Sequence, residues 1–166
     1  MKNLNIRAAA TGEAQVLASL NAEVQRLHVT NRPDVFKAVS TSDVTAWFEN
    51  LAADPSATVW VAEADGVPVG YVLVMIRETT ENAFIKARRW WEVDQLGVAT
   101  SHRRRGIARA LLKHVIAQAR ARGITDLELQ TWAFNHAAQS AFRRLGFLPQ
   151  KARYELHLGP KAPAKP

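Results

Sequence analysis

The spacing of apolar residues changes once in the middle of the chain, and this change marks its most informative stretch. From Trp91 to Val98 apolar and polar residues alternate, as in a β-strand. From Gly106 onward the apolar residues recur every three or four positions, which predicts an amphipathic helix that ends at Gly123. The alternation predicts a strand with Val93 and Gln95 on one face and Glu92, Asp94, Leu96 and Val98 on the other.

The segment between this strand and this helix is rich in arginine, and it reads SHRRRG from Ser101 to Gly106. The first turn of a helix leaves backbone N–H groups without partners, and the helix dipole places partial positive charge there. Small residues at Gly106 and Ala108 would let an anion approach the backbone closely. We therefore predict a site for an anion such as a pyrophosphate, with a solvated basic helix start as the alternative. The arginines of this segment are Arg103, Arg104 and Arg105.

The rest of the chain alternates short predicted strands and helices, which indicates a mixed α/β sheet. A turn at Asp65 and Gly66 predicts a hairpin. A helix capped by Thr41 or Ser42 places Trp47 and Phe48 in the core. The predicted strands are 4–9, 58–64, 67–78, 125–132 and a final pair at 147–148 and 154–158, and two further helices are 13–28, capped near Thr11, and 135–145.

Length and composition favour a single soluble domain. The chain has 166 residues, 48% of them hydrophobic, and no apolar run approaches the length of a membrane span. It contains no cysteine, which excludes disulfides and thiolate metal sites. The first residues lack the apolar core of a signal peptide. We expect one domain over 1–158, a disordered proline-rich tail over 159–166, a cytoplasmic location and no membrane contact.

The net charge of +7 favours an anionic partner. Nucleic acid is one class, and a stripe of basic residues along the predicted loop and helix would supply phosphate contacts. However, aromatic residues are not interleaved with the basic ones as in single-strand binders, and no zinc-finger or RNP signature is present. Nucleic-acid binding is therefore the less favoured alternative. The stripe consists of Arg103, Arg104, Arg105, Arg109 and Lys113.

Two motifs in order resemble those of a known family. Arg103-x-x-Gly106-x-Ala108 resembles the acyl-CoA-binding motif Q/R-x-x-G-x-G/A of the GNAT superfamily of N-acetyltransferases. The segment from Asn135 to Phe147, NHAAQSAFRRLGF, is similar to the motif that follows in that family. The resemblance extends over about 59–147 and implies a mostly antiparallel, twisted sheet flanked by helices and splayed at its central strands to hold acyl-CoA.

The resemblance also implies an activity: transfer of an acetyl group from acetyl-CoA to a primary amine of a small molecule or peptide, without a metal. Glu92 falls where some family members carry a catalytic glutamate, and Asp94 is the second candidate base, although both could simply be exposed charges. The backbone N–H of Val98 would stabilise the oxyanion. A homodimer is among the arrangements that the resemblance implies. Cofactor contacts are expected from Leu96, Val98, Arg103, Arg104, Arg105, Gly106, Ile107, Ala108, Asn135 and Phe142.

One position departs from the family pattern. A tyrosine that often protonates the departing CoA thiolate is replaced by Phe142, which has no proton to donate. The thiolate is a tolerable leaving group without help, because a thiol has a pKa of about 8.5. A CoA-binding module with weak or no catalysis is therefore a second hypothesis. Asn135 could contact the cofactor arm or cap the following helix.

Overall fold

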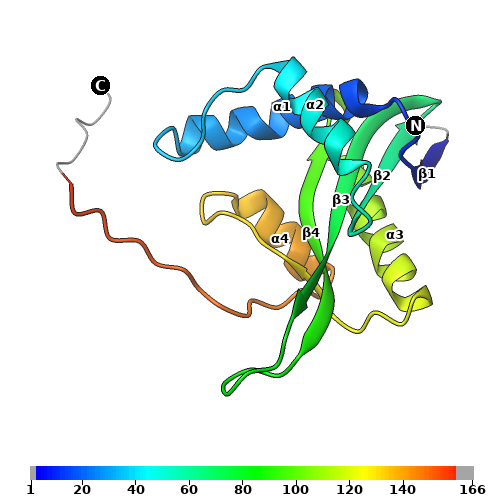
Figure 1. Ribbon diagram of the computed structural model, residues 1–166. Coiled ribbons are helices and arrows are strands. Elements are labelled where there is room, and N and C mark those ends of the chain that lie inside the picture. The colour runs from blue at the N-terminus through cyan, green and yellow to red at the C-terminus, as the bar shows by residue number, and fades with distance from the viewer. Residues whose placement is uncertain (1–2, 160–166) are drawn as a thin grey trace. The chain divides into compact units, whose positions relative to one another are not determined.

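The computed structural model describes residues 3–159 (Figure 1). The chain divides into two compact units, Met1–Phe134 and Asn135–Pro166. The single domain expected over 1–158 stays a prediction. Of the tail expected over 159–166, all but Gly159 lies outside the described residues.

The first unit is built on a five-stranded sheet in the order β1-β2-β3-β4-β5. The first four strands are antiparallel and β5 runs parallel to β4, which confirms the predicted mixed, mostly antiparallel sheet. Asp65 and Gly66 both have positive φ (51° and 83°), as a two-residue hairpin turn requires. The strands are β1 (Leu4–Ala8), β2 (Ala57–Ala64), β3 (Val67–Thr79), β4 (Arg88–Val98) and β5 (Leu127–Leu129).

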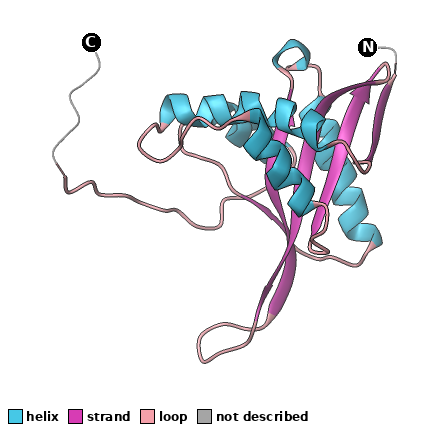
Figure 2. Cartoon of the chain, turned by 45° about the horizontal axis from the view of Figure 1, so that its top comes forward, coloured by secondary structure: helices cyan, strands magenta, loops and turns pink. Residues whose placement is uncertain are grey.

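Helices cover both faces of this sheet. α1 (Ala14–Asn31) and α2 (Thr41–Leu51) lie on one face, and α3 (Ile107–Ala121) lies on the other (Figures 1 and 2). The first face buries Leu17 and Leu20 of α1 with Phe48 of α2 against β2 and β3. The α3 face buries the apolar stripe that the sequence predicted: Ile107, Leu111, Leu112, Val115 and Ala119.

A β-bulge in β4 changes which residues share a face. Gln95 of β4 pairs with Leu73 of β3, and Val93 pairs with the next residue of β3, Val74. Asp94 is therefore an extra residue in β4 that has no partner in β3. Neighbouring residues of a strand point to opposite faces. Val93 and Gln95 therefore lie on opposite faces, and the prediction that they share one was wrong.

The bulge also separates residues that the alternation had grouped. Beyond it, Leu96 and Val98 point their side chains to the α3 face, opposite to Glu92. Glu92 and Asp94 do share a face, because both bond the side chain of Arg77 on β3. An inserted residue of this kind leaves no trace in a hydrophobic pattern of period two.

The sheet opens between β4 and β5. β5 pairs only with Trp91, Glu92 and Val93 of β4. The following residues, 94–98, remain beside β3 but have no strand partner on their other side among residues 3–159. This is the splay at the central strands that the resemblance implied.

Several element ends differ from the predictions. α1 has no side-chain cap and continues to Asn31, past the predicted end at His28. α2 is capped by Ser40, whose hydroxyl accepts from the Asp43 N–H (3.1 Å), one residue before the predicted Thr41. β5 has three residues rather than eight. None of the helices within residues 3–159 is long and apolar enough to cross a membrane.

The second unit contains one helix, α4 (His136–Arg144). The pair of strands predicted over 147–148 and 154–158 is absent: residues 145–159 form no strand. The apolar side chains of the second predicted strand, Tyr154, Leu156 and Leu158, are more than four-fifths exposed. Alternation alone does not make a strand, because the backbone also needs a neighbouring strand for its hydrogen bonds.

Candidate active site

The open half of β4 presents backbone groups that have no strand partner among the described residues. The Ala99 N–H donates to the Val69 carbonyl (2.9 Å), and antiparallel neighbours exchange such bonds at every second residue. The N–H and C=O groups of Leu96 and Val98 therefore point away from β3, toward the side that β5 leaves after Val93. An extended amide chain could pair with these groups as an additional strand would.

The start of α3 lies just beyond this edge. The first intrahelical bond runs from the Ala110 N–H to the Gly106 carbonyl (2.9 Å), so that the N–H groups of Ile107, Ala108 and Arg109 have no intrahelical partner. No side chain caps them. Gly106 has a φ of 82°, and an added Cβ would meet no atom within 4 Å. The helix start is thus open to an anion.

The loop before α3 is braced by α1. Thr100 donates to the carboxylate of Glu23 through its backbone N–H (2.6 Å) and its hydroxyl. These hydrogen bonds, led by that of the hydroxyl, hold the pKa of the Glu23 carboxyl below its usual value. Arg103 bonds the Val98 carbonyl (3.2 Å) and lies 3.4 Å from Glu23. The other two loop arginines, Arg104 and Arg105, are exposed.

The two carboxylates of β4 have different surroundings. Arg77 donates to one oxygen of Glu92 (2.7 Å) and Gln130 donates to the other (2.7 Å). The Glu92 side chain is 13% exposed. Both oxygens of the first candidate base are thus held by hydrogen bonds.

Asp94, the bulge residue, is less constrained. Its only described ion pair is to Arg77, at 3.2 Å, and its side chain is 32% exposed. Burial raises the pKa of the Asp94 carboxyl, and the charge of Glu92 raises it further, while Arg77 opposes both. Of the two, Asp94 is therefore the carboxylate with fewer hydrogen-bond partners.

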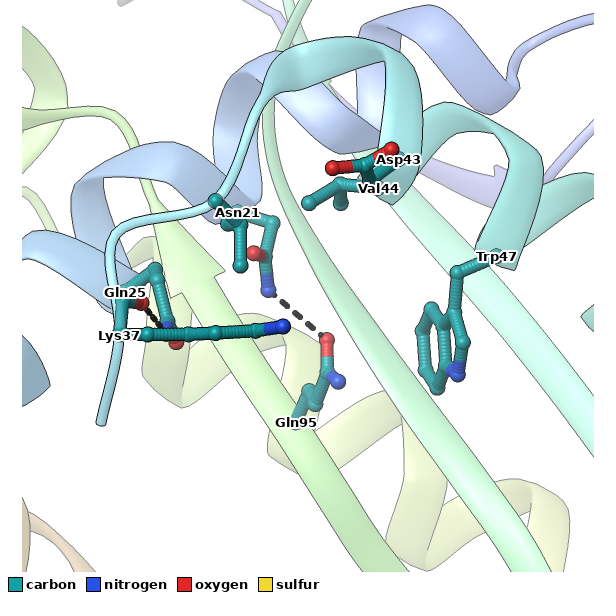
Figure 3. Close-up of a pocket in the computed structure, with 8 residues that line it drawn as sticks. Asn21, Gln25, Lys37, Asp43, Val44, Trp47 and Gln95 are labelled. Carbon is teal, nitrogen blue, oxygen red and sulfur yellow. Dashed lines mark hydrogen bonds between the residues drawn. The ribbon is translucent and has the colours of Figure 1, made fainter. Parts of the chain in front are cut away.

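A pocket of about 320 Å³ lies between α1, α2 and β4, on the face that carries Gln95 (Figure 3). Of the two aromatic residues that the sequence assigned to the core, Phe48 is buried, but Trp47 is 42% exposed and lines this pocket. The assignment of Trp47 was wrong because this side chain lies on the side of α2 that faces the pocket, next to Phe48 on the side that faces the core. The lining residues are Asn21, Gln25, Lys37, Val39, Asp43, Val44, Trp47 and Gln95.

A buried tyrosine orients the side chain of Gln95. The Tyr71 hydroxyl donates to Gln95 Oε1 (2.8 Å), and the amide of Asn21 donates to both (2.9 and 3.1 Å). Burial raises the pKa of Tyr71, so its hydroxyl stays protonated. Gly97 makes room for this ring, since a Cβ there would lie 2.6 Å from it.

The second unit holds the two remaining candidates. Asn135 accepts a hydrogen bond from the Ala138 N–H (3.1 Å) and is therefore the N-cap of α4. Phe142 packs edge-on against Phe147, with ring centroids 6.1 Å apart. Among residues 3–159, no group of three or more His, Cys, Asp or Glu side chains is placed to hold a metal ion.

The sequence matches the acetyltransferase (GNAT) family over residues 22–147. The chain belongs to this family. The match includes the open half of β4, the loop before α3 and α4, so that the family assignment and the described geometry concern the same residues.

Curated relatives of this GNAT chain share part of its length. It is 35% identical to N-acetyltransferase family 8 member 2 of Rattus norvegicus over 107 residues, which cover 64% of this chain and 43% of that protein. It is 27% identical to N-acetyltransferase 8 of Homo sapiens over 118 residues, 71% and 49% of the two chains. The chain spans less than half the length of these relatives.

Solved structures show the same fold. The BH1408 protein of Bacillus halodurans, crystallised as a tetramutant, has a TM-score of 0.86 at 24% identity, over 93% of this chain and 99% of that one. An aminoglycoside N-acetyltransferase, AAC(6')-Iy, crystallised with CoA, has a TM-score of 0.74 at 19% identity. The likeness covers 93% of this chain and 94% of that one.

Sequence reasoning did not connect the members of an aromatic cluster in this GNAT chain. The His28 ring stacks on Phe36 in the loop after α1 (4.8 Å), and Phe36 meets Trp132 edge-on (5.3 Å). Burial lowers the pKa of His28. No local pattern links His28 and Phe36 to Trp132, because that residue lies about a hundred positions further along the chain. Gln95 was also missed, since the bulge that turns it to the pocket has no sequence signal.

Proposed function

We propose that this protein is an N-acetyltransferase that moves an acetyl group from acetyl-CoA to a primary amine of a small molecule or peptide. The observation that carries this proposal is the open half of β4, whose outward backbone groups have no strand partner, beside a helix start without a side-chain cap that follows three arginines. Membership of the GNAT family supports the reaction class.

The residues present fit the cofactor. In this proposal the N–H groups of Ile107 and Ala108, with the charges of Arg104 and Arg105, hold the pyrophosphate at the start of α3. The amide groups of the pantetheine arm pair with backbone groups of Leu96 and Val98. Arg103 takes part once it leaves the Val98 carbonyl. Asn135 and Phe142 are assigned to the cofactor arm as well.

The thioester supplies the acetyl group and a thiolate leaving group. The amine nitrogen forms a bond to the carbonyl carbon, the carbon–sulfur bond breaks, and the amine loses one proton. An alkyl ammonium with a pKa of about 10.4 is only roughly 0.04% neutral at pH 7, so a base is useful. The Val98 N–H would bind the carbonyl oxygen as it gains charge. Phe142 cannot donate, so the thiolate takes its proton from solvent.

We assign the base to Asp94 rather than Glu92. Both oxygens of Glu92 are engaged by Arg77 and Gln130, whereas Asp94 has one longer contact to Arg77. The raised pKa of Asp94 brings the carboxyl nearer to the value at which a base works best around neutral pH. In this assignment Glu92 holds the Arg77 guanidinium at 2.7 Å, so that Arg77 does not form an equally short ion pair with Asp94.

Calorimetry with acetyl-CoA tests the cofactor part of the proposal. We expect the parent protein to bind and Gly106→Glu to bind at least roughly 100-fold more weakly, because a carboxylate would occupy the anion site. The matched control is Gly123→Glu. Gly123 also has a positive φ (69°) with nothing within 4 Å of an added Cβ, but it lies at the other end of α3. Equal losses in both variants would contradict the assigned site.

Turnover is tested by acceptor-dependent release of the CoA thiol. Saturable release with a primary amine supports the transferase. Tight cofactor binding with no release above the rate in buffer, across a broad panel of amines, would leave the CoA-binding module, which the missing hydroxyl at Phe142 favours. If acetyl-CoA does not bind at all, salt-dependent binding of nucleic acid is the next measurement.

A further inference from the structure

The pocket beside Gln95 has features that acetyl transfer by itself does not require. Three apolar side chains line it, two of them unusually exposed: Trp47 (42%) and Val39 (37%), with Val44 next to them. Large apolar side chains left open to solvent around a pocket indicate a surface that an apolar group covers when it binds.

The opposite side of the pocket carries a positive charge on a fixed backbone. Gln25 of α1 donates to the Lys37 carbonyl (2.9 Å), and the preceding residue, Phe36, stacks on His28 at 4.8 Å. The side chain of Lys37 reaches across the pocket toward Gln95 (Figure 3). Within the described residues, no carboxylate lies close enough to Lys37 to form an ion pair. Its charge is therefore free to meet a ligand.

Gln95 adds neutral donors on the same side. Its Oε1 already accepts from Tyr71 and Asn21, which fixes the orientation of the amide. Its Nε2 is then directed away from these partners and has no acceptor among residues 3–159. A cation and an amide NH₂ that line the same pocket are suited to a carboxylate, which accepts hydrogen bonds on both oxygens.

We propose that this pocket binds an acceptor of the amino-acid type: a primary amine that also carries a carboxylate and an apolar side group. The carboxylate meets Lys37 and Gln95, and the apolar group lies against Trp47. Asp94 directly precedes Gln95 on β4, so the amine of such a molecule is within reach of the assigned base. This inference rests on the proposed transferase function and names its substrate class.

Asp43, on the rim of the same pocket, suggests the opposing hypothesis. Its carboxylate has no described ion pair and could hold the second ammonium of a diamine. Figure 3 shows Asp43 beside Val44 and away from Lys37. A diamine would place an apolar chain, and no anion, against Lys37 and Gln95, and would leave both without a partner. The two donors in the pocket lining therefore favour the carboxylate.

The test compares three acceptors of one shape: L-phenylalanine, L-phenylalaninamide and phenethylamine. We would measure kcat/KM for each by thiol release, with the parent protein and with Lys37→Gln. For each acceptor, kcat/KM of the variant is divided by kcat/KM of the parent. This ratio cancels differences in the basicity of the three amines. We expect Lys37→Gln to reduce kcat/KM for L-phenylalanine roughly 10- to 100-fold, the effect of losing one charge-assisted hydrogen bond, and to leave the other two within about threefold.

Two variants complete the design. Lys37→Arg keeps the charge and should restore most of the activity on L-phenylalanine. Lys113→Gln removes an exposed lysine of α3, on the opposite face of the sheet, and should change none of the three ratios.

The outcomes separate this inference from the proposed function. Equal ratios for all three acceptors with Lys37→Gln, or parent activity on phenethylamine but none on L-phenylalanine, would overturn the carboxylate assignment while the transferase stands. Preference for 1,5-diaminopentane, lost in Asp43→Asn, would establish the diamine instead. No turnover of any amine would remove both proposals.

Discussion

The two halves of β4 differ in what surrounds them. Residues 88–93 have β3 on one side and, from Trp91, β5 on the other, and their charged side chains are paired across strands, as Glu92 is with Arg77. Residues 94–98 have a strand on one side only. One strand thus contains a closed half, which resembles the interior of any sheet, and an open half with free backbone groups.

The difference shows that a potential binding site is formed at the expense of hydrogen bonds between strands. A free strand edge leaves hydrogen-bonding groups without protein partners, which ordinary sheets avoid. The bulge at Asp94 directly follows Val93, the last residue of β4 that pairs with β5. We infer that side chains of the closed half contribute mainly to stability and those of the open half mainly to activity. The following predictions test this division, from the largest effect to the smallest.

Replacing the carboxylate at the boundary should have the largest effect. In Asp94→Asn we expect kcat/KM for an amine acceptor to fall roughly 100-fold, the lower end of general base catalysis. The acid limb of the pH profile should also disappear, because its position follows the raised pKa of Asp94. Measurement is by initial rates of thiol release across pH.

Glu92→Gln is the matched control for Asp94→Asn, two residues away in the closed half. It should lower the rate less than roughly tenfold and keep the acid limb, while reducing the free energy of unfolding because Arg77 loses its shortest ion pair. The opposite ranking of the two variants would show that Glu92 is the base, as the resemblance first suggested.

Gly97→Ala should disturb the open half through packing. The added Cβ would lie 2.6 Å from the Tyr71 ring, and this buried ring has little space to move. We expect the free energy of unfolding to fall by about 1–3 kcal/mol, typical of an overpacked core, measured by urea denaturation.

A double-mutant cycle identifies the cause of the Gly97 effect. If the clash with the ring is responsible, Gly97→Ala should cost less in a Tyr71→Leu background than in the parent. Additive losses would mean that the glycine is needed for another reason.

Glu13→Gln should have the smallest effect and leave activity unchanged. Arg7 of the edge strand β1 bonds Glu13 (2.6 Å) and Glu63 (2.7 Å), and its hydrogen bond to Glu13 lowers the pKa of that carboxyl from 4.5 to about 2. A carboxyl group whose pKa is lower in the folded than in the unfolded state stabilises the fold at any pH above the unfolded-state pKa. This contribution is lost as the pH falls from about 4.5 to about 2. The variant should be less stable by roughly 1–2 kcal/mol at pH 7 and lose less on acidification. An unchanged acid transition, followed by circular dichroism, would contradict this.

Much of the fold could be predicted because its signals are local. The period of apolar residues identified α3 and its buried stripe, Asp65 and Gly66 identified the hairpin, and the spacing around Gly106 identified the helix start that is open to an anion. The predictions that failed depend on which other segments of the chain lie beside a residue. Alternation over 154–158 predicted a strand for which the structure provides no neighbour.

The sequence by itself determined the family, the order of the elements and the two carboxylates of β4, because short-range spacing and motifs carry that information. Only the tertiary structure decided which carboxylate is held by neighbours and which is free, because Arg77 and Gln130 reach Glu92 from other strands. It also decided, through one inserted residue, that Gln95 joins Lys37 in a pocket. Both outcomes depend on contacts between residues far apart in the chain, which no local pattern specifies.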